Sequence, residues 1–187
     1  MATSWRSELP CAGEAQAAGP QRGESSKTIS LLIVGLKDDD ARPAAAAALL
    51  DLGGQACSAL LLVAESAVLS PTGENASSRR RRRSALELLR EIGIGRDDWP
   101  TLHPSIDDPY PRIAMTACDI ALALDMSGDE SVHRLVGLAS TTDFLLSLQI
   151  AVCVVRHYAV ARDVVNSLIA DHEPTSDGSG EHRLGGA

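Results

Sequence analysis

The stretch RLVGLASTTDFLLSLQIAVCVV, residues 134–155, decides the fold that this sequence predicts. Its two ends, RLVGLA (134–139) and QIAVCVV (149–155), are apolar runs of strand length, and TTDFLLSL (141–148) between them predicts a turn that enters a short helix. Two earlier runs, ISLLIVGL (29–36) and SALLLVA (58–64), have the same character. Continuous Val, Ile and Leu runs without polar alternation are typical of strands covered on both faces of a parallel sheet.

Helical patterns separate these runs along the chain. Helices are predicted at 42–54, 79–95, 112–126 and 161–172, and the first of them carries Pro43 in its first turn and glycines at its end. A Pro-rich connection at 97–111 has no clear period. The alternation predicts a three-layer α/β/α sandwich with a mainly parallel sheet over 28–173, flanked by disordered tails at 1–27 and 174–187.

Composition narrows the class of protein. The chain has 187 residues, of which 44% are apolar, which is enough for one domain with its own core. A net charge of −8 argues against coating nucleic acid by bulk electrostatics. No apolar run is long enough to span a membrane, and the acidic N-terminal region lacks a signal core, so we expect an intracellular protein, cytoplasmic or nuclear, with an organelle left open. The four cysteines are widely spaced without a CxxC pair, and three of them lie in apolar segments, so we expect them to fill the core in a reducing compartment, with zinc binding or disulfides as the alternatives.

Carboxylates stand where a parallel sheet would bind a ligand. Asp38 follows the first predicted strand, Asp143 follows RLVGLA, and Asp119 lies early in the helix at 112–126. Clustered carboxylates are tolerated around a divalent cation, so Asp38, Asp119 and Asp143 form a candidate Mg²⁺ or Mn²⁺ site, with Asp119 and Asp143 as the catalytic pair. The alternatives are a solvated loop at Asp38, a helix-capping role at Asp143 and a structural role at Asp119.

An arginine run, RRRRR, suggests a partner. Guanidinium groups suit phosphate, so the run could contact RNA even on an acidic protein. The candidate nucleic-acid site comprises Arg79, Arg80, Arg81, Arg82 and Arg83 with Thr141 and Thr142. A solvated charge run and a nuclear import signal are the alternatives.

The order of several segments resembles a known family. SALELLREIGIG, then a Pro-rich loop, then ACDIALALDM, then RLVGLASTTDFLLSLQIAVCVV and ARDVVNSLIADH, is similar to the NYN domain, the LabA-like branch of the PIN-like nuclease superfamily. The resemblance covers residues 84–172, and 29–64 in pattern only. It implies a PIN-like α/β fold, acidic residues that bind a divalent metal, and RNA cleavage. Asp119 matches the aspartate that opens the helix motif, and Asp143 with Phe144 matches the end of the S-G-D-x-D-F motif.

The chain departs from that family at two of four acidic positions. Thr141 stands at the first aspartate of the S-G-D-x-D-F motif, and Val34 or Gly35 stands where an acid ends the first strand. Three functions therefore stay open: a domain that engages RNA with catalysis weakened or lost, an active metal-dependent endoribonuclease, and a non-catalytic scaffold that binds a protein partner or a second copy. The sequence contains no Walker loop, GxGxxG or GxSxG motif, which argues against P-loop, dinucleotide and triad enzymes.

Overall fold

The stretch 134–155 folds as parts of two helices and contains no strand. In the computed structural model, α7 (Gly128–Ala139) contains RLVGLA, and α8 (Phe144–Arg156) contains both the end of TTDFLLSL and QIAVCVV. The structure describes residues 22–65 and 74–172, and over these ranges it is helical with no sheet. The predicted α/β/α sandwich with a parallel sheet is therefore wrong.

The other elements are also helices. They are α1 (Arg22–Gly35), α2 (Arg42–Leu52), α3 (Gly54–Glu65), α4 (Ala76–Ile92), the 3₁₀ turn η1 (Arg96–Asp98), α5 (Trp99–Leu102), the 3₁₀ turn η2 (His103–Asp107), α6 (Pro111–Ala123) and α9 (Tyr158–His172). The connection at 97–111, predicted as irregular, is thus mostly short helical turns. The structure begins α1 at Arg22, so residues 22–27 of the predicted N-terminal tail are helical; residues 1–21 and the predicted tail at 174–187 lie outside the described ranges.

The apolar runs that suggested strands belong to helices with buried and exposed sides. The buried side chains at this end of α1 are Ile29 and Ile33 of the helix and Leu36, the residue that follows it, which are four and three residues apart, while Leu31 and Val34 are exposed. This is the helical period, because residues three and four apart share one helix face. Exposed apolar residues fill the gaps between the buried positions, so the run has no visible period, and a short unbroken apolar run does not distinguish a strand from a helix.

The four helices that the sequence predicted are present at nearly the expected places. Pro43 lies in the first turn of α2, and Gly53 ends that helix with a φ of 51°. Asn75 caps α4 by accepting a hydrogen bond from the Ser78 N–H at 2.8 Å, and Gly93 ends it with a φ of 83°. Left-handed backbone at a helix end favours glycine, which explains why these stop signals could be found in the sequence.

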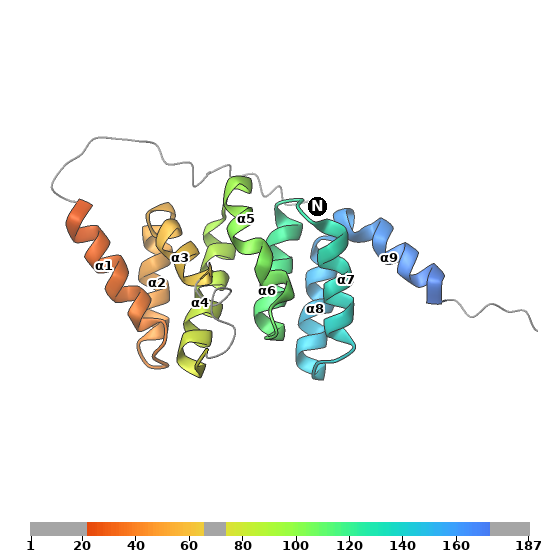
Figure 1. Cartoon of the computed structure of the whole chain (residues 1–187), viewed down its shortest axis with the longest axis horizontal. Helices are drawn as coiled ribbons and strands as arrows, with labels where there is room; N and C mark the ends of the chain where they lie inside the picture. Colours follow the sequence, from red (N-terminus) through yellow and green to blue (C-terminus); the bar gives the residue numbers. More distant parts are fainter. Residues whose placement is uncertain (1–21, 66–73, 173–187) are drawn as a thin grey trace, which may run out of the picture.

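The helices stack in two layers that run the length of the molecule (Figure 1). In one layer α2 packs on α4, α4 on α6 and α6 on α8; we call it the even layer. In the other, α1 packs on α3, α3 on α5 and α7 on α9. The core between the layers is built mainly from Leu, Ile and Ala, for example Leu49, Leu60 and Leu89, all fully buried. Each helix pair contacts mainly its neighbours, the arrangement of stacked helical arrays, which use extended surfaces to bind partners.

No helix among the described residues is long and apolar enough to cross a membrane.

Candidate functional site: an arginine-lined groove on the even layer

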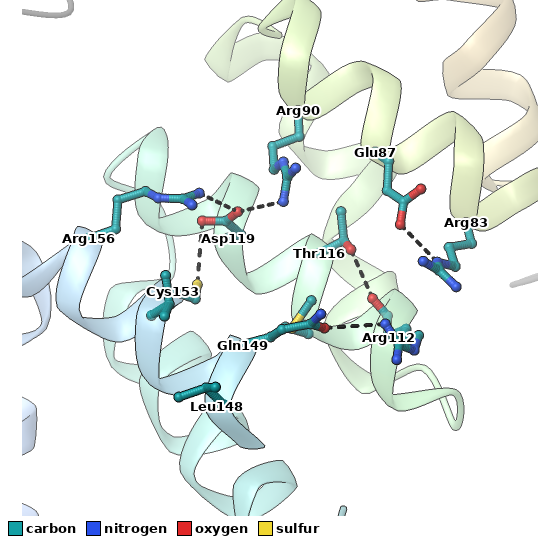
Figure 2. A pocket seen from close by; sticks show the side chains of 12 residues that line it. Arg83, Glu87, Arg90, Arg112, Thr116, Asp119, Leu148, Gln149, Cys153 and Arg156 are labelled. Carbon is teal, nitrogen blue, oxygen red and sulfur yellow. Dashed lines mark hydrogen bonds and ion pairs between the residues drawn. The ribbon is translucent and has the colours of Figure 1, made fainter. Parts of the chain in front are cut away.

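A groove opens on the even layer between α4, α6 and α8 (Figure 2). It has a volume of about 400 Å³. Four arginines line it, together with two carboxylates and the apolar side chains of Met115, Leu148 and Val152; the charged residues are Arg83, Glu87, Arg90, Arg112, Asp119 and Arg156. We call it the arginine groove. Its lining carries an excess of positive charge on a chain whose net charge is −8.

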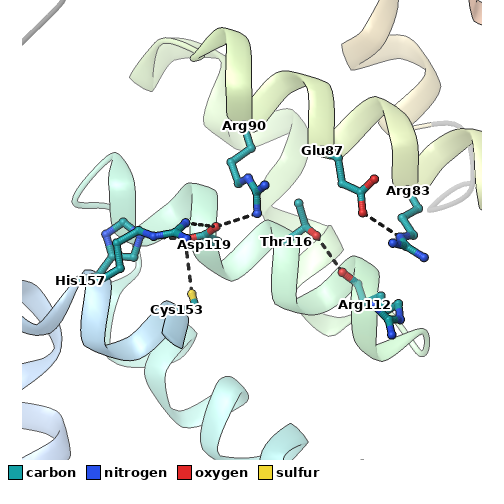
Figure 3. A network of polar contacts seen from close by, with 9 residues as sticks. Arg83, Glu87, Arg90, Arg112, Thr116, Asp119, Cys153 and His157 are labelled. Carbon is teal, nitrogen blue, oxygen red and sulfur yellow. Dashed lines mark hydrogen bonds and ion pairs between the residues drawn. The ribbon is translucent and has the colours of Figure 1, made fainter. Parts of the chain in front are cut away.

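Asp119 ties the three helices together at one end of the groove (Figure 3). Its Oδ2 atom accepts hydrogen bonds from Arg90 of α4 at 3.1 Å and from Arg156 of α8 at 3.2 Å. Its Oδ1 atom contacts His157 Nε2 at 2.7 Å and Cys153 Sγ at 3.4 Å. The side chain of Asp119 is only 6% exposed, so these partners replace the water that a carboxylate would otherwise require.

The protonation of this cluster follows from its contacts. Burial alone would raise the pKa of Asp119, but the hydrogen bonds from His157 and Cys153 and the charge of Arg156 outweigh burial, so the pKa lies below its ordinary value. Burial, and then the neighbouring Asp119 carboxylate, raise the pKa of Cys153. The sulfur is therefore a neutral thiol at pH 7 that donates to an ionised carboxylate.

Asp119, Cys153 and His157 are also the only group of three metal-ligating side chains found close together within the described ranges, with ligand atoms within 4.8 Å of one another. One oxygen, one sulfur and one nitrogen are not the oxygen ligands that Mg²⁺ and Mn²⁺ select. The donors are closer to those of zinc, but Arg90 and Arg156 already place two positive charges on the same carboxylate. This positive charge opposes a cation, and we therefore interpret the cluster as a hydrogen-bonded hub.

The structure does not bring the three predicted metal ligands together. Asp119 lines the arginine groove, whereas Asp143 and Asp38 each line a different cavity. Asp143 is exposed and caps α8 by accepting a hydrogen bond from the Leu146 N–H at 3.0 Å. Asp38 is exposed in the turn between α1 and α2, where the N–H groups of Asp40 and Ala41 lower its pKa. The arrangement therefore offers no carboxylate site for Mg²⁺ or Mn²⁺ among these residues, and cleavage of RNA stays a prediction that rests on the resemblance.

The arginine run lies inside α4 and divides by burial. Arg82 is 2% exposed and lies between two buried carboxylates: it binds Glu74 through two nitrogens, at 3.1 and 2.8 Å, and also pairs with Asp108. Burial lowers the pKa of Arg82, but these two carboxylates more than compensate and hold its pKa above the ordinary value. Arg82 therefore serves the fold. The prediction that it contacts RNA is wrong, because its guanidinium is buried between two carboxylates.

Of the other four arginines in the run, two form ion pairs with carboxylates among the described residues and two do not. Arg80 pairs with Asp39, and Arg83 pairs with Glu87 at 2.8 Å. The guanidinium of Arg79 lies 3.7 Å from the centre of the Tyr110 ring, and its Nε atom is buried without a hydrogen bond to a described residue. Arg81 lines a separate polar cavity near Asp38 and also has a buried Nε without a partner there.

A second cavity adjoins the arginine groove and collects several of the predicted nucleic-acid residues. Arg79, Arg80 and Arg83 of α4 line it together with Thr141, Thr142 and Asp143, which lie about 60 residues further along the chain. Tyr110, Arg112 and Leu146 complete most of its wall. We call it the Arg79 pocket. It shares Arg83 and Arg112 with the arginine groove, so the two cavities form one continuous basic surface.

Several groove residues were not predicted from the sequence. Arg90, Arg112 and Arg156 are isolated in the chain and meet only because α4, α6 and α8 are neighbours. One signal was present: Cys153 and His157 are four residues apart, the spacing that places two side chains on one helix face. It was missed because 149–155 was interpreted as a strand, in which that spacing has no such meaning.

Comparison with family models, with curated proteins and with solved structures finds no match for this chain. The resemblance to the NYN domain is thus without support from any of the three, and the α/β fold that it implies is the one that the helical structure contradicts. The candidate function has to be argued from the groove itself.

Proposed function

We propose that this protein is a non-catalytic binding module whose arginine groove holds an acidic amphipathic helix of a protein partner. The sequence left RNA engagement and protein interaction open, and the geometry supports protein interaction better. The observation that carries the proposal is the combination of two features on one surface: four arginines along the groove, and an exposed apolar face on the helix that forms one of its walls.

The apolar face belongs to α8. Leu145, Leu148, Val152 and Val155 are 65%, 52%, 52% and 72% exposed, and their spacing of three, four and three residues places them along one side of the helix. We call these four residues the α8 stripe. Single exposed apolar side chains are ordinary, but a row in register is typical of a surface that another element covers. Leu148 and Val152 also line the groove, so the stripe and the arginines face the same ligand.

The chemistry of both features defines the partner. A helix with apolar residues at i, i+3 or i+4, and i+7 would cover the stripe, as amphipathic helices do when they bind in apolar grooves. Acidic residues beside that apolar row would lie against Arg83, Arg90, Arg112 and Arg156. Complementary charge mainly increases the association rate and selects the partner, while burial of the apolar row supplies most of the affinity.

RNA fits the groove less well. Proteins that bind single strands combine a positive groove with aromatic side chains on which bases stack. The lining of the arginine groove contains no aromatic residue, and Arg79 covers the ring of Tyr110 in the adjoining pocket. The stripe would also be left in water, because a phosphate backbone offers no apolar surface to cover it.

The test is a binding measurement on the full chain by fluorescence anisotropy. The probes are a peptide designed to form an acidic amphipathic helix, a peptide of the same composition in scrambled order, and a single-stranded oligouridylate. We expect the ordered peptide to bind at least tenfold more tightly than the scrambled one, because only the ordered peptide presents a continuous apolar row. Val152→Asp should weaken that binding at least tenfold, since it places a carboxylate in the stripe.

The matched control is Val136→Asp on α7. Val136 is also an exposed valine, 43% accessible, but it lies in the other layer and lines neither cavity, so its substitution should change the affinity less than twofold. Tighter binding of oligouridylate than of the peptide would contradict the proposal in favour of RNA. Self-association that Val152→Asp abolishes, measured by sedimentation, would contradict it in favour of a second copy.

A further inference from the structure

The Arg79 pocket differs from the arginine groove in how its charges are balanced. Four arginines and one carboxylate line it. Arg80 and Arg83 already form ion pairs with Asp39 and Glu87, and the carboxylate, Asp143, accepts the hydrogen bond that caps α8. The charges that remain without a carboxylate partner among the described residues are those of Arg79 and Arg112.

These two guanidiniums are held in place by neutral groups. The guanidinium of Arg79 on α4 lies 3.7 Å from the centre of the Tyr110 ring, and its Nε atom is buried with no hydrogen-bond partner among the described residues. Arg112 of α6 donates to Gln149 Oε1 at 3.2 Å. A cation over an aromatic face keeps its charge and its donors while its orientation is restricted, so both side chains are oriented without being neutralised.

We propose that the Arg79 pocket binds a phosphomonoester, namely a phosphoserine or phosphothreonine carried by the acidic segment that lies in the arginine groove. This rests on the proposed function, because the pocket continues the groove through Arg83 and Arg112. A phosphomonoester carries close to two negative charges at pH 7 and offers three acceptor oxygens, so one group neutralises both arginines. Arginine binds such oxygens through two parallel N–H donors, which a lysine cannot do.

The charge balance also selects among anions. A carboxylate and the phosphodiester of a nucleic acid each carry a single charge, so each is attracted to the two guanidiniums less strongly than a phosphomonoester, and a carboxylate offers two acceptor oxygens where a phosphomonoester offers three. The hydroxyl groups of Thr141 and Thr142 lie on the same wall, but the Thr141 hydroxyl already donates to the backbone carbonyls of Gly137 and Leu138 and has no proton left for a phosphate oxygen. Ser147 Oγ donates to the Ala139 carbonyl at 2.9 Å, so the Thr142 hydroxyl is the donor in its 3.2 Å contact with Ser147 Oγ. The two guanidiniums, and not these hydroxyls, would therefore hold the phosphate.

The test uses small probes on the full chain, so that it does not depend on the peptide. The affinities of O-phosphoserine, inorganic phosphate, glutamate and the phosphodiester UpU are measured by calorimetry and by NMR titration at constant ionic strength. We expect O-phosphoserine to bind at least tenfold more tightly than glutamate or UpU. Arg79→Gln and Arg112→Gln should each weaken it at least tenfold, and Arg79→Lys at least threefold, because the charge stays but the paired donors are lost.

The control is Arg162→Gln on α9, where an exposed arginine pairs with its neighbour Asp163 and lines neither cavity; it should leave phosphoserine binding unchanged. Circular dichroism establishes that each variant keeps the parent's helicity. Equal affinity for glutamate and O-phosphoserine, tighter binding of UpU, or phosphoserine binding that neither Arg79→Gln nor Arg112→Gln alters would each overturn the proposal. If the chain binds the acidic peptide but not O-phosphoserine, the phosphate-binding proposal is overturned while the proposed function stands.

Discussion

At the scale of single residues, the structure explains a carboxylate that the sequence made conspicuous. Asp119 precedes an unbroken apolar run, and aspartate is rarely buried without partners. It is buried here because four side chains from α4, α8 and the residue that follows α8 donate to its two oxygens. Its role is to join the helices that form the groove, which is the structural alternative that the sequence analysis had left beside the metal site.

Replacing Asp119 should change both the stability and its pH dependence. We expect Asp119→Asn to lower the free energy of unfolding at pH 7 by about 2 kcal/mol, below the 3–5 kcal/mol typical of a fully buried pair, because Arg90 and Arg156 are partly exposed and can be rehydrated. The pKa of Asp119 is lower in the folded chain than in the unfolded chain, so the unfolded state binds more protons in acid. The stabilisation is therefore complete above the ordinary aspartate pKa and is lost as the pH falls through the folded value.

Urea denaturation of the parent and of Asp119→Asn between pH 7 and about pH 3 measures this effect. The difference between the two proteins should be largest near neutrality and should shrink in acid, since the parent then loses the same charge. A difference that stays constant over this range would show that the lost packing or amide geometry, and not the carboxylate charge, causes the destabilisation.

At the scale of elements, the same sequence signals succeed and fail for identifiable reasons. Helix ends could be found because Pro43, Gly53 and Gly93 act locally, through restricted or left-handed backbone. The apolar runs could not be assigned, because the helices of this array bury one side and also expose leucine and valine on another. In α8, Leu146 and Ile150 are buried while Leu145 and Leu148 are exposed. The first two are apolar because they pack in the core, whereas the other two belong to the exposed α8 stripe.

Arg82 joins two elements, and its replacement should be among the most destabilising changes in the chain. Arg82 of α4 neutralises Glu74, just before that helix, and Asp108, just before α6, and all three side chains are nearly buried. Arg82→Met should lower the free energy of unfolding by about 3–5 kcal/mol, because it leaves two carboxylates buried without a counter-charge. Chemical denaturation measures this cost.

Two further variants test the cause. Arg83→Gln, at the next position of the run, removes only an exposed pair with Glu87 and should cost less than about 1 kcal/mol. Adding Glu74→Gln and Asp108→Asn to Arg82→Met should restore much of the lost stability, because no charge then remains buried. If the triple variant is as unstable as Arg82→Met, the loss comes from the shape of the site and not from its charge.

At the scale of the whole molecule, the two-layer stack separates charge. The chain has a net charge of −8, yet α4, α6 and α8 collect arginines from positions as far apart as 79 and 156 on one surface. Neighbouring helices of one layer place these positions side by side, although the sequence has no internal repeat from which this clustering could be predicted. An acidic protein can in this way present a basic binding surface.

Salt should therefore act on binding more than on folding. Raising NaCl from about 50 mM to 500 mM should lower the affinity for the acidic amphipathic peptide at least tenfold, because interactions between exposed charges are screened over shorter distances as ionic strength rises. The free energy of unfolding should change little, since the apolar core and the buried Arg82 and Asp119 contacts are screened much less. Anisotropy titrations and urea denaturation at the two salt concentrations measure the two quantities; peptide affinity independent of salt would show that the arginines do not contact the ligand.

The sequence by itself determined where several helices end and that one apolar core exists, and it singled out Asp119 and the arginine run as charged positions that need partners. These follow from local backbone preferences and from composition, which do not depend on distant contacts. Only the tertiary structure decided that the apolar runs are helices, that Asp38, Asp119 and Asp143 line separate cavities, and that Arg82 is buried while Arg79 faces a pocket. The physical reason is the packing of neighbouring helices: it selects which side of each apolar segment is buried, and it brings together charges that the chain separates by dozens of residues.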